Sequence, residues 1–172
     1  MTIPPTTLFP SELLIDNQYF NNEGIQFRPL QLTDYDKGFS ELLQQLTEAK
    51  FDRAKFVERF LQMKKENDTY FIVVAEDVNK KRIIATGSVV IEKKFIRGCA
   101  LCGHIEDIVV DQTYRGKNLG LKIIDQLKHI GSQLGCYKLI LDCEDKNQKF
   151  YEKCGFERKQ VMMALYLPRA KL

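Results

Sequence analysis

One segment of this chain combines the residue types that bind phosphate. Residues 114–120 read Tyr-Arg-Gly-Lys-Asn-Leu-Gly and lie between a strand-like stretch and a long segment with an apolar stripe. The two glycines permit a tight turn, and a helix that begins there directs unpaired N–H groups and the positive end of its dipole toward a phosphate oxygen. Arg115 and Lys117 add positive charge. The segment is neither a Walker loop nor the three-glycine dinucleotide fingerprint, so a turn without a ligand is the alternative.

Two adjacent acids interrupt the apolar stretch at residues 104–110. Alternation along a strand would place Glu106 and Asp107 on opposite faces of a sheet. Burying acids in this way is costly without partners, which favours a functional pair over a salt-bridged sheet edge.

The five cysteines are scattered along the chain, at Cys99, Cys102, Cys136, Cys143 and Cys154. An odd number without a secretory signal predicts reduced thiols. Cys99, Cys102 and His104 have a spacing that suggests zinc, but a tetrahedral site needs a fourth ligand and normally a second close pair. The sequence therefore predicts no metal.

Composition bounds the class of protein. The chain has 172 residues, of which 44% are hydrophobic and 28% charged, and a formal net charge of +3. This charge is too small and too mixed for a dedicated nucleic-acid binder. The chain has no apolar run near the roughly 18 residues of a membrane span, so we expect a soluble cytosolic protein.

Hydrophobic periodicity predicts alternating strands and helices after an N-terminal arm at residues 1–24, and a single domain at residues 25–172. The expected strands are residues 25–30, 70–75, 83–91, 104–110, 137–142 and 161–167, of which 137–142 should be buried on both faces. The expected helices are residues 33–47, 52–65, 119–134 and 147–153.

The Arg-Gly-x-x-Leu-Gly segment, followed by the long helix, a strand and Phe-Tyr-Glu-Lys-Cys-Gly-Phe at 150–156, resembles the GNAT acetyltransferase superfamily. Residues 103–110, 135–143 and 150–156 resemble most closely its glucosamine 6-phosphate N-acetyltransferases. The resemblance implies an α/β (α+β) fold, in which helices flank a central mixed, mostly antiparallel twisted sheet.

The sequence departs from the family pattern at two positions. Asn118 stands where glycine is frequent, and asparagine tolerates the left-handed conformation. Tyr166 stands where the family has an arginine expected to bind the sugar phosphate, and Arg169 is the candidate replacement.

The resemblance implies acetyl transfer from acetyl-CoA, without a metal, to the amine of D-glucosamine 6-phosphate in UDP-N-acetylglucosamine biosynthesis. It also implies a cytoplasmic homodimer whose site is completed across the interface. The alternatives are another amine acceptor on the same fold, such as a polyamine, an arylalkylamine or a protein lysine, and a non-catalytic CoA-binding module.

The catalytic roles also follow from the resemblance. Tyr151 would be the acid for the departing thiolate, and Asp142 is favoured as the base, with Glu106 as the alternative. Glu106 and Asp107 would hold the hydroxyls and amine of the substrate. Cys143, next to Asp142, would lie near the CoA sulfur, where oxidation could join the two in a mixed disulfide.

The binding residues complete the expected site. Those implied for acetyl-CoA are Ile108, Val109, Val110, Arg115, Gly116, Lys117, Asn118, Leu119, Gly120, Asn147, Phe150 and Tyr151. Those implied for the sugar phosphate are Thr47, Lys94, Phe95, Ile96, Arg97, Glu106, Asp107, Asp125, Gln126 and Asp142. Lys94 and Arg97 are the phosphate candidates, whereas Asp125 and Gln126 would complete the partner's site or be ordinary exposed helix residues.

Overall fold

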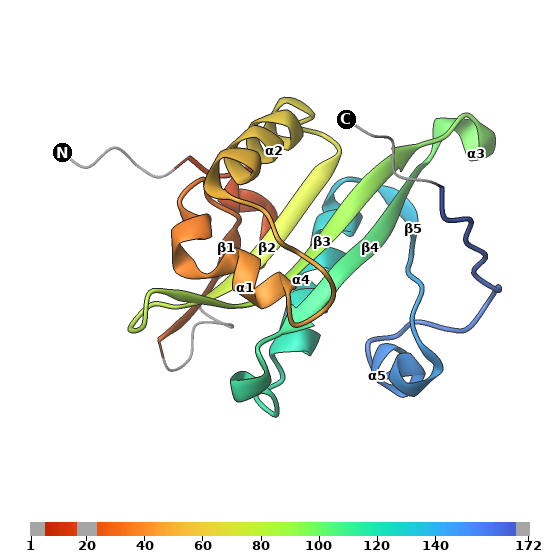
Figure 1. Ribbon diagram of the computed structural model, residues 1–172. Coiled ribbons are helices and arrows are strands. Elements are labelled where there is room, and N and C mark those ends of the chain that lie inside the picture. Colours follow the sequence, from red (N-terminus) through yellow and green to blue (C-terminus); the bar gives the residue numbers. More distant parts are fainter. Residues whose placement is uncertain (1–5, 17–23, 168–172) are drawn as a thin grey trace. The chain divides into compact units, whose positions relative to one another are not determined.

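A five-stranded sheet forms the centre of the larger part of the molecule (Figure 1). The computed structural model describes residues 6–16 and 24–167. The strands follow one another in chain order and are antiparallel except for the last pair, which is parallel. They are β1 (Ile25–Pro29), β2 (Tyr70–Asp77), β3 (Arg82–Lys93), β4 (Leu101–Val110) and β5 (Cys136–Ile140).

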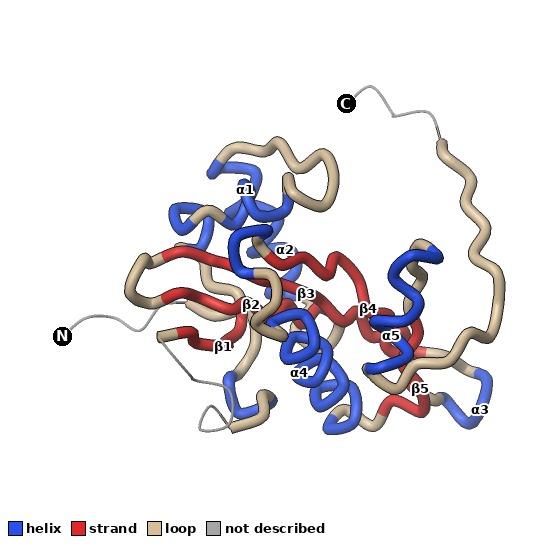
Figure 2. The backbone as a smooth tube through the Cα atoms, turned by 90° about the horizontal axis from the view of Figure 1, so that it is seen from below, coloured by secondary structure: helices blue, strands red, loops and turns tan. Residues whose placement is uncertain are grey.

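Helices cover both faces of this sheet. α1 (Phe39–Leu43) and α2 (Arg53–Lys65) lie on one face and α4 (Leu119–Gln133) on the other, as the two views in Figures 1 and 2 agree. The apolar stripe predicted for α4 faces the core, because Leu119, Ile123, Leu127 and Ile130 are all buried. These contacts fix the position at which α4 begins, directly after the predicted phosphate-binding segment.

The helix expected at residues 33–47 is interrupted. A 3-10 turn occupies Asp34–Lys37, Gly38 takes a left-handed φ of 82°, and α1 then extends for only 5 residues. A glycine in this conformation ends one helical segment and redirects the chain. The prediction for α2 is confirmed, since Asp52 caps it by accepting the Lys55 N–H at 2.8 Å.

β5 is an edge strand, and the expectation that it would be buried on both faces is wrong. Tyr137 and Ile140 are exposed to 39% and 36%. Among the described residues β5 pairs on one side only, with β4, and three of its five residues are exposed.

The chain forms two compact units, residues 1–141 and residues 142–172. The second contains a 3-10 turn at Asp145–Asn147 and α5 (Gln148–Lys153). The prediction of a strand at residues 161–167 is wrong: this described segment has no regular secondary structure. The segment pairs with no described strand, and its apolar side chains are strongly exposed.

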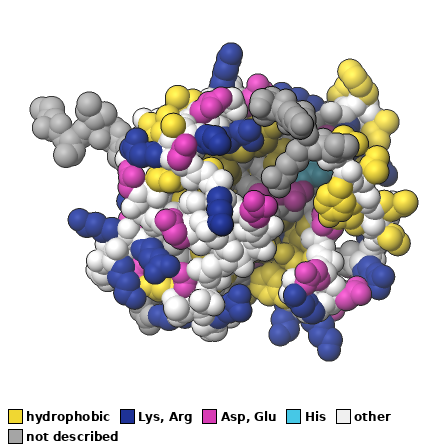
Figure 3. Space-filling view, in the orientation of Figure 1, with side chains coloured by type: hydrophobic (Ala, Val, Ile, Leu, Met, Phe, Trp, Pro, Cys, Tyr) yellow, Lys and Arg dark blue, Asp and Glu magenta, His cyan; other side chains and the backbone are white. Residues whose placement is uncertain are grey.

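The rest of unit 1 includes a short 3-10 turn, Ser11–Leu13, and the short α3 (Ile96–Cys99) between β3 and β4. Within the described ranges, no helix is both long and apolar enough to cross a membrane. Lys, Arg, Asp and Glu side chains are interspersed over the face in Figure 3, as the mixed composition predicts.

Candidate active site

The predicted phosphate-binding segment forms an exposed loop between β4 and α4. Gly116 and Asn118 have left-handed φ values of 85° and 56°, which turn the chain sharply into the helix. The first N–H groups of α4 have no acceptors within the helix. Together with the exposed Arg115 and Lys117, they make the loop suitable for a phosphate anion.

A buried aspartate shapes the chain between β4 and the loop. Asp111, 1% exposed, accepts hydrogen bonds from the Thr113 N–H (2.9 Å) and hydroxyl (2.6 Å), and also from Gln45 and Arg82. Burial acts to raise the pKa of Asp111, but these hydrogen bonds and the positive charge of Arg82 hold it below its ordinary value. The carboxylate therefore stays ionised and fixes the turn.

Tyr114 anchors the start of the loop, a role that the sequence did not indicate. Its hydroxyl donates to Asp77 at 2.6 Å and accepts from Lys80 at 2.9 Å, while the Lys117 ammonium lies 5.7 Å from the ring centroid. The hydrogen bond from Tyr114 lowers the pKa of Asp77. Asp77 lies far away in the chain, so only the hairpin geometry brings the two together.

β4 carries a β-bulge at the two acids. Between the pairs Ser88–Glu106 and Thr86–Val109, β3 contributes one residue and β4 two. Asp107 takes a left-handed φ of 54°. The expectation that Glu106 and Asp107 lie on opposite faces of a regular strand is therefore wrong. Both side chains are exposed, so the energetic cost of burying an acid no longer supports a functional role for them.

β4 and β5 separate beside the bulge. Their pairing ends at His104–Ile140, and β4 continues from Ile105 to Val110 without a strand on that side among the described residues. Backbone N–H and C=O groups along this edge can therefore bind a ligand. Ile108 and Val110, expected to contact acetyl-CoA, are half-buried at this edge, and Val109 is buried.

The expected phosphate-binding cations lie on the turn that enters β4. The Lys94 ammonium pairs with Glu92 at 2.6 Å, and the Arg97 guanidinium lies 5.2 Å from the centroid of the Tyr137 ring. Phe95 is 95% exposed and Ile96 65%. The turn thus presents Arg97 and two apolar side chains on the surface, whereas the Lys94 side chain is only 22% exposed.

The other expected substrate residues in unit 1 have different environments. Thr47 is exposed in the turn after α1, and Asp125 pairs with Lys128 on its own helix at 3.3 Å. Gln126 is fully buried, where it accepts the Ile15 N–H at 2.8 Å and donates to the Ile15 carbonyl at 3.4 Å. It therefore anchors the N-terminal arm and is not the exposed helix residue weighed as the alternative.

The second unit holds the expected acid. Tyr151 packs edge-on against Phe150 and Phe156, with ring centroids 5.0 and 6.3 Å away. Burial raises the pKa of Tyr151, and Cys143 acts in the same direction. The Tyr151 phenol is therefore protonated at neutral pH.

The remaining residues expected in the second unit lie near its surface. Asp142 and Cys143 are exposed, as is Asn147, which precedes α5. Partial desolvation at this exposed position, followed by the charge of Asp142, raises the pKa of Cys143. Tyr166 is 92% exposed, and Arg169 lies outside the described residues.

Comparison with known proteins agrees with this geometry. The acetyltransferase (GNAT) family matches residues 34–156. Glucosamine 6-phosphate N-acetyltransferase 1 of Dictyostelium discoideum is 67% identical over 147 residues, which cover 86% of this chain and 94% of that protein. The glucosamine 6-phosphate N-acetyltransferase of Arabidopsis thaliana is 45% identical over 150 residues, 84% of this chain and 97% of that one.

The solved structures give the same fold. The crystal structure of the Arabidopsis thaliana enzyme superposes with a TM-score of 0.82 at 45% identity, covering 85% of this chain and 100% of that one. A predicted acetyltransferase from Clostridium acetobutylicum, solved with acetyl-CoA, shares the fold at 20% identity and a TM-score of 0.62. The expected mixed sheet with flanking helices is confirmed, and the chain belongs to the acetyltransferase (GNAT) family.

Proposed function

We propose that this chain transfers the acetyl group of acetyl-CoA to the amine of D-glucosamine 6-phosphate, releasing CoA and N-acetylglucosamine 6-phosphate. One observation carries the proposal. The bulged strand β4 has an open edge, and it leads directly into an exposed anion-binding loop in a chain 67% identical to an enzyme with this name. Such an arrangement would suit acetyl-CoA, whose pantetheine arm could bind along the backbone of β4 and whose pyrophosphate could bind at the loop.

The loop would hold the pyrophosphate of acetyl-CoA. Gly116 and Asn118 aim the N–H groups at the start of α4 outward, and Arg115 and Lys117 supply countercharge. Leu119 is buried and fixes the helix beneath, and Gly120 follows it in the first turn. The amide groups of the substrate's pantetheine arm would pair with the open edge of β4 as an added strand does.

The acceptor would bind beside the bulge. Glu106 and Asp107 offer carboxylates for the hydroxyls and amine of the sugar, while Lys94 and Arg97 offer cations for its phosphate. A backbone N–H at Ile108 or Val109 would stabilise the oxyanion of the tetrahedral intermediate. An acceptor without phosphate, such as a polyamine, has no anionic group to pair with the two cations.

Two residues of the second unit would move the protons. As the amine attacks the thioester, the C–N bond forms and the C–S bond breaks. Asp142 takes the proton that the amine loses, and Tyr151 gives its hydroxyl proton to the thiolate. Tyr151 has a proton to give at neutral pH, as any phenol with a pKa of 10 or above does, and its role rests on the family resemblance.

Thiol release from acetyl-CoA tests the acceptor and the acid together. Glucosamine 6-phosphate, glucosamine and a lysine peptide are offered to the wild type, to Tyr151→Phe and to Tyr70→Phe, a control on β2 outside the expected site. We expect turnover with the phosphorylated sugar alone, and a loss of kcat of about 100-fold or more in Tyr151→Phe only. Turnover with the peptide, or with no acceptor, would refute the substrate.

Lys94 and Arg97 have their own test. In Lys94→Met and Arg97→Met, the KM for glucosamine 6-phosphate should rise about tenfold or more, because a charge-assisted contact to phosphate is lost, while the KM for acetyl-CoA stays unchanged. Lys149→Met, an exposed control on α5, should leave both values unchanged. An unchanged KM for the sugar phosphate in both turn variants would remove these residues from its site.

The working form would be a homodimer with a site completed by its partner subunit. The described C-terminal segment supports this, since Val161, Met163, Leu165 and Leu167 are each at least 76% exposed. Light scattering should give twice the mass of 20.0 kDa, and Met163→Glu should yield monomers. A monomeric wild type would refute the assembly.

The cytoplasm would be the compartment of this enzyme. All five cysteines are free, and reduced thiols are typical of reducing compartments. Fractionation of cells that express a tagged chain would test this location.

A further inference from the structure

Three side chains of different chemistry meet on one face of β3 and β4. Glu92 of β3 pairs directly with Cys102 of β4, and His104 follows two residues later, so the strand period of two places all three on one side. One ligand atom from each, a carboxylate oxygen, the thiol sulfur and an imidazole nitrogen, lies within 4.8 Å of the others. None of the three residues is among those proposed for acetyl transfer, although Glu92 pairs with Lys94, a proposed ligand of the sugar phosphate.

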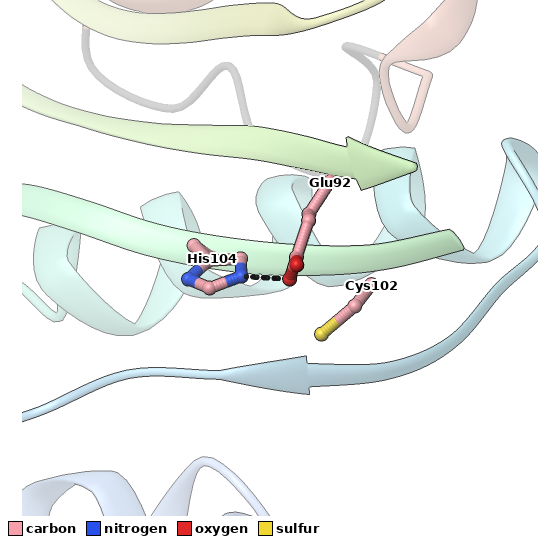
Figure 4. A group of neighbouring side chains, drawn as sticks. All are labelled: Glu92, Cys102 and His104. Carbon is pink, nitrogen blue, oxygen red and sulfur yellow. Dashed lines mark hydrogen bonds and ion pairs between the residues drawn. The ribbon is translucent and has the colours of Figure 1, made fainter. Parts of the chain in front are cut away.

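The cluster has the arrangement of an open metal site. Figure 4 shows the His104 ring and the Glu92 carboxylate directed toward one another, with His104 Nε2 2.9 Å from the Glu92 oxygen, and the Cys102 sulfur near the carboxylate. The side chains of His104 and Glu92 are 35% and 42% exposed, whereas Cys102 is fully buried. A metal ion from solvent would meet the Glu92 and His104 atoms first and would reach the buried sulfur as these two side chains move apart.

The geometry points to a zinc site formed by Glu92, Cys102 and His104, with water as the fourth ligand. Zinc binds sulfur, nitrogen and oxygen at about 2.0–2.3 Å, which separates tetrahedral ligands by roughly 3.4 Å. The observed atoms need to shift by about 1 Å or less to reach that separation. Both strands belong to the paired part of the sheet, so the three ligands are held before the metal arrives.

Binding of a divalent cation changes the charge of the cluster. On binding, the Cys102 thiol loses its proton to solvent as the Zn–S bond forms. The thiolate and the Glu92 carboxylate then give the ion two negative charges, and Lys94 remains beside them as a positive charge. The Lys94 ammonium pairs with the other Glu92 oxygen at 2.6 Å and can stay there, because His104 and the metal use the opposite one. The ion would thus link the strands at the base of the 94–100 turn.

Cobalt and zinc titrations of the full-length chain test this site. The protein is reduced with a phosphine, freed of metal with a chelator, and titrated with Co²⁺, whose bond to a thiolate absorbs in the near ultraviolet. We expect one equivalent to give this band together with the visible bands of tetrahedral cobalt, and one equivalent of Zn²⁺ to abolish both. Absence of the thiolate band in the wild type would overturn the proposal.

Matched variants locate the site. His104→Gln and Glu92→Gln should weaken Co²⁺ and Zn²⁺ binding by roughly tenfold or more, and Cys102→Ser should remove the thiolate band. His129→Gln and Cys99→Ser, the other histidine and the exposed nearby cysteine, should bind as the wild type does. Unchanged binding in His104→Gln and Glu92→Gln, or loss of the band in Cys99→Ser, would refute the assignment. If Cys102→Ser fails to fold, the two partly exposed variants decide.

Discussion

Asp107 combines a charge with a backbone conformation that few side chains adopt. Its φ of 54° lies in the left-handed region, where asparagine and aspartate are tolerated and β-branched residues are strained. The same residue is a candidate ligand for the substrate amine. It therefore has two proposed roles, shaping the bulge and presenting a carboxylate, and different substitutions remove one role or the other.

Two substitutions separate these roles. Asp107→Val should lower the free energy of unfolding by about 1–2 kcal/mol, because the bulge forces the branched side chain into a strained conformation. That loss corresponds to a fall in Tm of roughly 2–8 °C. Asp107→Asn should keep the wild-type Tm within about 1 °C and yet lose kcat, which steady-state assays would measure. Full activity in Asp107→Asn would show that only the backbone of this residue matters.

The Cys143 thiol should react slowly at neutral pH. Partial desolvation and then the charge of Asp142 raise its pKa, so the reactive thiolate is scarcer than for an ordinary cysteine. Its rate of mixed-disulfide formation with oxidised CoA should rise about tenfold per pH unit between pH 7 and 8. Intact mass, compared between the wild type and Cys143→Ala, measures this adduct. A rate that does not change with pH, or an equal adduct in the variant, would contradict the prediction.

The chemical character of a residue was easier to predict from the sequence than its neighbours in space. The sequence indicates the loop at residues 114–120 because its signal is local. It could not show the bulge at Asp107, since a bulge depends on the partner strand. It could not place Glu92 beside Cys102 either, because only the register of β3 against β4 makes them neighbours. Spacing along the chain therefore did not offer Glu92 as a ligand beside Cys102 and His104, and the zinc site stays a proposal.

A buried ion network attaches the 3-10 turn before α1 to the sheet. Arg28 of β1 donates to Asp34 at 2.7 Å and to Glu76 of β2 at 2.9 Å, and Lys37 donates to Glu76 at 2.7 Å. Burial acts to raise the pKa of Glu76, but Lys37 and Arg28 hold it below its ordinary value of 4.5. The ionised carboxylate therefore stabilises the folded state.

Glu76→Gln should lower the free energy of unfolding by about 2–3 kcal/mol at pH 7, because the charge-assisted hydrogen bonds are weakened. Since the folded pKa is depressed, this contribution is present above the unfolded pKa and is lost as pH falls through the folded value. The difference in free energy of unfolding between wild type and variant, measured with denaturant, should therefore disappear below about pH 4. Glu58→Gln, exposed on α2, serves as the control. A gap that persists in acid would contradict the charge argument.

Tyr114 is a positioning residue for the loop. Without its hydroxyl, Asp77 loses the donor at 2.6 Å and the hairpin no longer fixes the start of the loop. Tyr114→Phe should raise the KM for acetyl-CoA by about three- to tenfold with kcat nearly unchanged, because phosphate binding and not chemistry is impaired. Steady-state kinetics at saturating sugar phosphate measures this split. A fall in kcat at unchanged KM would assign Tyr114 to the chemical step.

At the scale of elements, long periodic segments were predictable and their terminations were not. α2, α4 and the β2–β3 hairpin match the hydrophobic pattern, because their burial follows from their own period. Gly38 divides the helix expected at residues 33–47, because its left-handed conformation ends the 3-10 turn before α1 begins. The segment 161–167 has a strand-like composition, but a strand also requires a neighbour to pair with.

The whole molecule raises the question of how many chains form one site. The resemblance assigns Asp125 and Gln126 to the partner's site. Gln126 is fully buried against the Ile15 main chain, so a substitution there would disturb the arm as well as any site. Asp125 is half-buried and pairs with Lys128 of its own helix, away from the arm, which makes it the cleaner residue to change.

Mixed dimers of two inactive chains would reveal a shared site. Asp125→Ala and Tyr151→Phe chains carry different affinity tags, are co-expressed, and the heterodimer is isolated by both tags in turn. If each site takes Tyr151 from one subunit and Asp125 from the other, one site of the heterodimer holds both wild-type residues and the other holds neither. The heterodimer should therefore show about half of the wild-type kcat, whereas both parent homodimers are nearly inactive. If each site takes both residues from one chain, every site carries one defect and the heterodimer stays as inactive as its parents. Full activity of Asp125→Ala alone would exclude Asp125 from the reaction, and the two-tag purification itself would fail if the chain did not dimerise.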